Sequence, residues 1–150
     1  MKKPIRVYLD SSVIGGAFNT RIAKETKPFW DAFQRGEFIV IVSDILEDEL
    51  VNAPQRARDF YTNLPKSQVE RIVSTQKSDD LAKQYIADGV VSNESLADCK
   101  HVALATIAKA SVIVSWNLTH MVKRSDEYKK VNAKLGLPQI SIKTPDKELP

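Results

Sequence analysis

Three carboxylates, Asp10, Glu49 and Asp98, stand at positions where ionised side chains are unusual. Asp10 directly follows Ile5 to Leu9, a short apolar run rich in strand-forming residues. An aspartate there can cap a helix that begins at Ser12 or Val13. It can also point into a ligand site, and its position alone does not separate these two interpretations.

Glu49 lies within the apolar face of a predicted helix that begins after Ser43. At about 100° per residue, its neighbours on the helix surface are Leu46, Leu50 and other apolar side chains, while Glu47 and Asp48 face the opposite way. A buried carboxylate loses several kcal/mol of solvation unless a positive group meets it. The alternatives are a salt bridge to a lysine or arginine, or a helix boundary that returns Glu49 to water.

Asp98 shows the same pattern in a helix dense in alanine and leucine, where Val102 and Ala105 are its nearest neighbours. The segment from Ser95 to Asp98 also has the spacing of a capping box, in which Asp98 would bond back to the Ser95 amide. That alternative starts the helix at Ser95, whereas Ser92 or Asn93 would start it a turn earlier.

Taken together, the three acids predict a site for a hard divalent cation. Ligands that offer only oxygen favour Mg²⁺ or Mn²⁺ over zinc. Three like charges share a pocket only when a cation offsets them, and that cation can also activate water at neutral pH. Acid clusters with a hard cation are a common arrangement for cleaving phosphodiester bonds.

The elements that must position these acids alternate between strands and helices. Apolar runs predict strands at Ile5–Leu9, Phe38–Val42 and Ser111–Val114, with an edge strand at Gln139–Lys143. Predicted helices run from the Pro28 region to Gly36, from Asp44 to Ala53, from Arg56 to Leu64, from Lys66 to Ser74, from Ser78 to Asp88, and from Asn93 to Ala110.

This alternation predicts an α/β fold, a three-layer sandwich with a mainly parallel central sheet. In such folds ligands gather beyond the carboxyl ends of the strands. The places to look are therefore Asp10, Ser43 and the segment from Ser115 to Asn117, all of which follow predicted strands.

The composition is that of a soluble globular protein, with 43% hydrophobic and 27% charged residues and a net charge of +3. We expect one domain over residues 1–150. Cys99 is the single cysteine, so no intramolecular disulfide forms and a cytoplasmic location is expected. The start of the chain does not have the pattern of a signal peptide, and no apolar run is long enough to span a membrane.

The order and spacing of four segments resemble the PIN domain family. These segments are Val7 to Val13 followed by Gly15-Gly16, Ser43 to Leu50 followed by Ala53-Pro54, Ala97 to Ala105, and Val114 to Val122. The resemblance covers about Ile5 to Ile142. It implies a PIN-like fold and a Mg²⁺- or Mn²⁺-dependent ribonuclease acting on single-stranded RNA, as in the toxin half of bacterial toxin–antitoxin pairs.

Carried over by position, the resemblance makes Asp10, Glu49 and Asp98 the metal-binding acids and gives Ser12 a role in orienting Asp10. It also implies an antitoxin protein as partner, and a homodimer. Many active members have an aspartate where this chain has Asn117, within a Ser-Trp-Asn segment typical of one branch of the family. A neutral amide would hold a second metal less tightly, so the alternative is a catalytically weakened RNA- or protein-binding module.

Other polar and aromatic residues carry less specific signals. His101 and His120 are poor metal ligands for an oxygen-rich site. Trp116 could stack a base or belong to the core, while Trp30 and Cys99 are assigned to the core. Basic residues that could contact phosphates are Arg21, Lys24, Lys27, Lys123 and Arg124.

Two other α/β folds with clustered acids rank lower. A receiver-type phosphoacceptor needs an aspartate at the end of a middle strand, where this chain has Ser43. A phosphatase of the haloacid dehalogenase type needs an aspartate two positions after Asp10, where this chain has Ser12.

Overall fold

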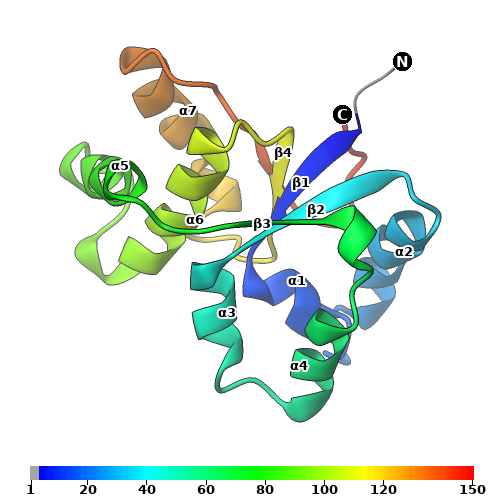
Figure 1. Ribbon diagram of the computed structural model, residues 1–150. Coiled ribbons are helices and arrows are strands. Elements are labelled where there is room, and N and C mark those ends of the chain that lie inside the picture. The colour runs from blue at the N-terminus through cyan, green and yellow to red at the C-terminus, as the bar shows by residue number, and fades with distance from the viewer. Residues whose placement is uncertain (1–3) are drawn as a thin grey trace.

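The computed structural model describes residues 4–150 of the chain. A sheet of five parallel strands lies at its centre (Figure 1). The strand order is β3-β2-β1-β4-β5. The strands are β1 (Ile5–Leu9), β2 (Phe38–Ser43), β3 (Val69–Ile72), β4 (Val112–Val114) and β5 (Ile142–Lys143). The first strand therefore lies at the centre, with Val7 paired to Val40 of β2 on one side and to Val112 of β4 on the other.

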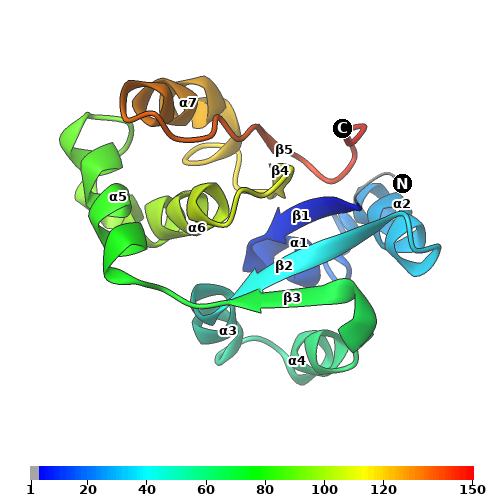
Figure 2. The same ribbon diagram turned by 45° about the horizontal axis from the view of Figure 1, so that its top comes forward.

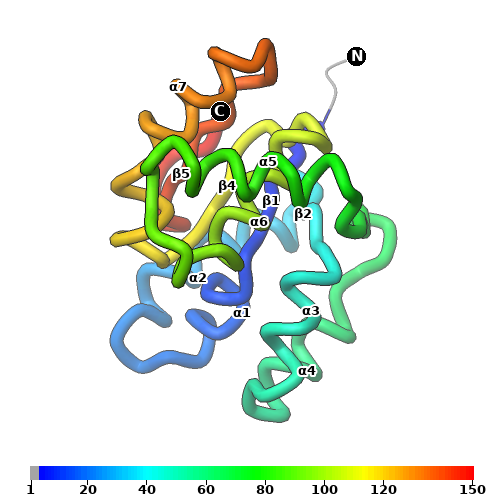
Figure 3. The backbone as a smooth tube through the Cα atoms, turned by 90° about the vertical axis from the view of Figure 1, so that its left-hand side faces the viewer, coloured from blue at the N-terminus to red at the C-terminus, as the bar shows by residue number. Residues whose placement is uncertain are grey.

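Helices cover both faces of the sheet, as Figure 2 shows. One layer contains α1 (Ser11–Gly16), α2 (Ala23–Gln34), α3 (Asp44–Leu50) and α4 (Gln55–Thr62). The other contains α5 (Gln76–Ala87), α6 (Leu96–Ile107) and α7 (Ser125–Lys134). Figure 3 views the molecule from the side of this second layer. Short 3₁₀ turns occur at η1 (Lys66–Gln68), η2 (Asn93–Ser95) and η3 (Val122–Arg124). The predicted three-layer sandwich is confirmed.

The alternation of side chains along each strand divides the core into two clusters. Val7 and Leu9 point toward the layer of α1 to α4, whereas Tyr8 points toward the layer of α5 to α7. Trp30 packs in the first cluster and Cys99 in the second, so the assignment of both residues to the core is confirmed.

Several predicted helix ends are confirmed by their capping residues. The Ser43 side chain accepts a hydrogen bond from the Leu46 amide at the start of α3. Gly36 and Gly89 adopt φ values of +78° and +80° just after α2 and α5, a conformation that glycine adopts without strain. The predicted start of α2 near Pro28 was wrong, because the helix begins at Ala23 and contains the proline.

The prediction of a helix from Lys66 to Ser74 was also wrong. After a single 3₁₀ turn, Val69–Ile72 forms β3 and pairs with β2 from Val40 to Ser43. The reason is tertiary: these residues complete an edge of the sheet, and that pairing outweighs a weak local helix preference.

The helix α7 was not predicted, because its sequence is rich in lysine and its apolar stripe is narrow. Only Tyr128, Val131 and Asn132 of this helix are buried. The edge strand β5 follows it and confirms the prediction for Gln139–Lys143, although it is shorter than predicted. Across residues 4–150, none of the helices combines the length and the apolar character that a membrane crossing requires.

Candidate active site

The acids predicted from the sequence lie at the carboxyl end of the sheet, next to the point where the strand order changes direction. From β1 the chain passes to β2 on one side, and β4 later pairs with β1 on the other. Such a switch point opens a crevice where ligands bind in open α/β sheets. Asp10 follows β1 and Ser115 follows β4, so both residues lie at this switch point, and the expected ligand-binding region between them is called the crevice.

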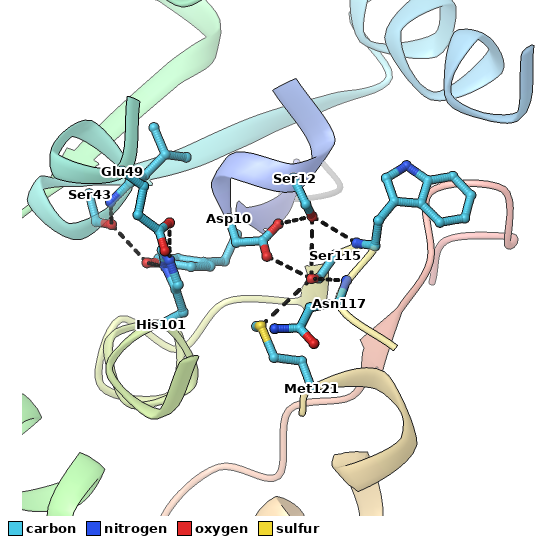
Figure 4. Close-up of polar contacts among 11 residues, drawn as sticks. Asp10, Ser12, Ser43, Glu49, His101, Ser115, Asn117 and Met121 are labelled. Carbon is cyan, nitrogen blue, oxygen red and sulfur yellow. Dashed lines mark hydrogen bonds and ion pairs between the residues drawn. The ribbon is translucent and has the colours of Figure 1, made fainter. Parts of the chain in front are cut away.

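Asp10 is 5% exposed, and each of its carboxylate oxygens accepts a hydrogen bond from a serine. Ser12 Oγ donates to Oδ1 at 2.6 Å, and Ser115 Oγ donates to Oδ2 at 2.7 Å (Figure 4). The Asp10 side chain makes no capping hydrogen bond to α1. Asp10 therefore occupies the N-cap position of α1, as one interpretation predicted, but its carboxylate accepts from the two serine hydroxyls and makes no capping hydrogen bond.

The segment after β4 holds both serines in place. The Trp116 amide donates to Ser12 Oγ at 2.8 Å, and the Asn117 amide donates to Ser115 Oγ at 2.9 Å. The Asn117 side chain accepts from the His120 amide through Oδ1 at 3.1 Å. Ser12 and Asn117 thus lie where the sequence predicted, and backbone N–H groups orient the two hydroxyls that contact Asp10.

Glu49 is less buried than its predicted place in the apolar face of α3 implied, because 31% of its side-chain surface is exposed. Its partner is neither lysine nor arginine. Glu49 Oε1 lies 2.7 Å from Nε2 of His101, whose side chain is 1% exposed (Figure 4).

His101 links Glu49 to a buried chain of hydroxyl groups. Its Nδ1 lies 2.7 Å from the Tyr8 hydroxyl, which lies 2.8 Å from Ser43 Oγ. Ser43 in turn accepts from the Leu46 amide at 3.2 Å. The hydrogen bonds therefore connect α6, the central strand β1 and the first turn of α3.

Asp98 does not form the capping box that its spacing allowed. The Ser95 amide donates to the carbonyl oxygen of Ser92 instead, and Ser95 Oγ lies 3.2 Å from His120 Nδ1. The same imidazole nitrogen lies 3.9 Å from Asp98 Oδ2. Asp98 is thus free of a capping role and faces the segment that follows β4.

Burial raises the pKa of Asp10, and the negative charge of Glu49 adds to this, although His101 and the two serine hydroxyls act in the opposite direction. Burial likewise raises the pKa of Asp98, against the influence of Asn117 and of the two histidines. In both cases the surroundings disfavour the ionised form, as expected where negative charges gather away from water.

Glu49 and His101 shift in the directions expected of an ion pair. Burial alone would raise the pKa of Glu49, but the hydrogen bond and charge of His101, together with the influence of Ser11, outweigh it and the net shift is downward. Burial alone would lower the pKa of His101, but Glu49 and the charges of Asp10 and Asp98 outweigh it and the net shift is upward. His101 is therefore within electrostatic reach of all three acids.

Within residues 4–150, no group of three or more His, Cys, Asp or Glu side chains is arranged so that it could hold a metal ion as it stands. No buried side-chain nitrogen or oxygen in that range lacks a hydrogen-bond partner either. The chemistry of the donors fits a hard cation, since Asp10, Glu49 and Asp98 offer oxygen only. A cation shared by all three acids would need their side chains to come closer together than they lie here.

The sequence interpretation did not identify His101 or Tyr8 as site residues, and it marked Ser115 only as part of a segment that follows a strand. His101 was considered only as a poor metal ligand, and its bond to Glu49 joins residues 52 positions apart. The available signal was the type of residue: a tyrosine within a fully apolar strand and a histidine within an alanine-rich helix both need polar partners when buried.

Trp116 is anchored beside the site rather than free to turn. Its indole Nε1 donates to Thr26 Oγ1 at 2.9 Å, and a Cβ at Gly16 would lie 3.0 Å from that nitrogen. The side chain is half-buried, so it combines a structural contact with some exposed surface.

The basic residues proposed as phosphate contacts are all exposed. Lys27 pairs with Asp31 at 2.7 Å and Arg124 with Glu127 at 3.3 Å, each on its own helix or at its start. These two pairs have the geometry of ordinary solvated surface charges.

No protein-family model and no curated protein sequence matches the chain. Solved structures do match it. VapC20 of Mycobacterium tuberculosis, a toxin that cleaves the sarcin–ricin loop, superimposes with a TM-score of 0.59 at 13% identity, over 90% of this chain and 98% of its own.

VapBC2 of Rickettsia felis, solved bound to a DNA fragment from its promoter, matches with a TM-score of 0.58 at 13% identity. That match covers 93% of this chain and 98% of the other. At 13% sequence identity, these two matches show that the fold is shared and nothing more. The described chain therefore has the PIN-like α/β fold of these toxin proteins, with its acids at the carboxyl end of the sheet.

Proposed function

We propose that this protein is a Mg²⁺- or Mn²⁺-dependent endoribonuclease that hydrolyses phosphodiester bonds of single-stranded RNA, and that it is the toxin of a toxin–antitoxin pair. The observation that supports this most strongly is that the charges of Asp10, Glu49 and Asp98 all act on one buried side chain, His101, in a chain with the fold of the toxin VapC20. VapC20, which shares the fold, is a toxin that cleaves the sarcin–ricin loop.

In this proposal Asp10, Glu49 and Asp98 hold the cation. A bound Mg²⁺ or Mn²⁺ activates water for attack on phosphorus and offsets the charge that develops on the phosphate. Ser12 and Ser115 fix the orientation of Asp10 by donating to its two oxygens. The backbone N–H of Asn117 supports the site by donating to Ser115 Oγ, and the neutral side chain of Asn117 adds no negative charge.

The decisive experiment measures cleavage of a fluorescently labelled single-stranded RNA with Mn²⁺ and with EDTA. Glu49→Gln should abolish the Mn²⁺-dependent cleavage, because it removes a charge that holds the cation. The matched control is Asp48→Asn, which removes the charge of the residue that directly precedes Glu49 in α3 and has an exposed side chain. Cleavage by Glu49→Gln that equals cleavage by Asp48→Asn would contradict the proposal.

The partners that follow from this function are a single-stranded RNA substrate, an antitoxin protein and a second copy of the chain. The first two belong to the cytoplasm. Co-expression with the product of a short neighbouring reading frame tests the antitoxin, since the pair should co-purify and lose ribonuclease activity. Light scattering after gel filtration tests the homodimer.

A second candidate function is a PIN-like module that binds RNA or protein without cleaving. Two observations favour it: Asn117 replaces the fourth acid and uses its side-chain oxygen for the His120 amide, and the acids do not converge as they stand. Calorimetry separates the two candidates, because a module of this kind would bind RNA while taking up no Mn²⁺.

A further inference from the structure

Glu49 begins a buried chain of polar groups whose other members have no role in the cleavage proposed above. The chain passes from Glu49 through His101 and Tyr8 to Ser43, and each link is 2.7 or 2.8 Å long. His101 and Tyr8 are completely buried, although both carry polar groups. Since polar groups lose solvation on burial, a chain of this length in a small core needs a reason.

The hydrogen on the Glu49 side of His101 can be assigned from chemistry. An ionised carboxylate only accepts hydrogen bonds, so Nε2 must carry the hydrogen that joins the imidazole to Glu49. At the other nitrogen, the Tyr8 hydroxyl can donate or accept, because Ser43 Oγ can complete the chain either way. Both arrangements hold the ring in one orientation, with Nε2 directed at Glu49.

We propose that His101, held by Tyr8 and Ser43, is a positioning residue that fixes the Glu49 carboxylate at the crevice for cation binding. Glu49 needs such a partner more than Asp10 does, because it lies on a short helix with 31% of its side chain exposed and has a long, flexible side chain. The imidazole occupies one lone pair of Oε1, and the carboxylate keeps others for a cation. This inference rests on the proposed function.

Two substitutions of His101 separate positioning from charge. Glutamine places its amide nitrogen as many bonds from Cα as Nε2, so His101→Gln keeps a donor for Glu49. Asparagine places its amide at the distance of Nδ1, so His101→Asn keeps the contact to Tyr8 and loses the one to Glu49. Both variants remove the same charge, and thermal unfolding checks that both are folded.

The readout is the affinity for Mn²⁺, measured on the intact protein by electron paramagnetic resonance of the free ion. We expect His101→Asn to weaken binding by about 10- to 100-fold, the effect seen when groups that orient metal ligands are removed. His101→Gln should stay within a few-fold of the unchanged protein.

A second pair of variants tests the far end of the chain. Tyr8→Phe removes the hydroxyl that holds His101, and it should weaken Mn²⁺ binding by several-fold. Its matched control is Tyr85→Phe, which removes the hydroxyl of another fully buried tyrosine. That hydroxyl donates to Asn132 and makes no hydrogen bond to Asp10, Glu49 or Asp98. The control should bind Mn²⁺ like the unchanged protein.

Equal Mn²⁺ affinities of His101→Asn and His101→Gln, whether both weak or both unchanged, would overturn the positioning role while leaving the proposed function intact. An unchanged protein that binds no Mn²⁺ would overturn the proposed function and this inference together. The two failures are thus distinguishable in one set of titrations.

Discussion

Two buried polar networks differ in charge: one joins α5, α6 and α7, and the other links α6 to the sheet and to α3. In one, the Tyr85 hydroxyl donates to Asn132 at 2.6 Å and the Asn132 amide donates to Thr106 at 3.1 Å. In the other, the Tyr8 hydroxyl contacts His101, which pairs with the ionised Glu49 near the buried Asp10.

The neutral network joins three helices and completes its hydrogen bonds internally, as a structural network should. The charged network includes groups whose burial opposes ionisation, and replacing such groups with neutral ones is often neutral or stabilising. The comparison indicates that the first network stabilises the fold, and it predicts that the second is retained for its proposed role in cation binding. Each prediction below breaks or sharpens that contrast.

Asp10→Asn should have the largest effect on activity. Cleavage should fall by at least about 100-fold, because the substitution keeps the shape of the side chain but removes the charge that is proposed to bind the cation. A loss of that size equals about 2.7 kcal/mol in the activation free energy. The melting temperature of this variant should stay the same or rise, since burial disfavours the aspartate charge. Single-turnover RNA cleavage and calorimetric unfolding measure the two quantities. A marked fall in stability would show that the charged network is structural after all.

Asn132→Ala should do the reverse. It leaves the Tyr85 hydroxyl and Thr106 without their shared partner, which should lower the free energy of unfolding by about 1–3 kcal/mol. Urea denaturation measures this loss, and RNA cleavage by the folded fraction should be unchanged. If cleavage fell as steeply as in Asp10→Asn, the two networks would not be separable.

The stability of the metal-free protein should fall as pH rises through neutrality. His101, whose folded pKa is raised from its ordinary value of 6.5, contributes stability that is complete below that value and is lost as pH rises through its folded pKa. Asp10 and Asp98 have pKa values raised from 3.8, so the loss of stability that they cause begins in acid, above that value. Glu49, whose pKa is lowered, contributes stability above its unfolded pKa and loses it only in acid.

Thermal unfolding in EDTA at pH 6 and pH 8 measures this, and Mn²⁺ should raise the melting temperature more at pH 8. His101→Gln should reduce the difference between the two pH values. A pH dependence that is the same with and without His101 would place the titrating groups elsewhere.

Two adjacent glycines of α1 give the smallest and most local test. A Cβ at Gly16 would lie 3.0 Å from Trp116 Nε1 and 3.1 Å from Thr26 Oγ1, whereas one at Gly15 has nothing within 4 Å. Gly16→Ala should therefore cost about 1 kcal/mol by overpacking and lower cleavage several-fold by disturbing the Trp116 amide that holds Ser12.

Gly15→Ala should stabilise the helix by about 0.5–1 kcal/mol and leave cleavage unchanged. Chemical denaturation and RNA cleavage of both variants provide the check. Identical behaviour of the two alanines would mean that Trp116 has no part in ordering the serines.

Much of the fold was predictable because β1, β2 and β4 are apolar on both faces, which indicates buried parallel strands. The strand β3 was not, since four residues with two charges acquire their conformation only by pairing with β2. The helix α7 escaped for a similar reason, because its stripe of buried residues is too narrow to stand out among lysines.

The same division holds for the site. Asp10, Ser12 and Asn117 could be predicted to meet, because they follow strands whose carboxyl ends share one edge of the sheet. The bond between Glu49 and His101 could not, because it depends on how α6 packs against α3, and side-chain periodicity does not report the relative position of two helices.

The bond between Ser115 and Asp10 joins residues 105 positions apart, and it has a consequence for biosynthesis. The central strand β1 is translated well before β4. Until β4 has left the ribosome, a nascent chain has Asp10 without the Ser115 hydroxyl that holds one of its oxygens. For a chain proposed to cut RNA, this order of synthesis would keep the proposed site incomplete until β4 has been added.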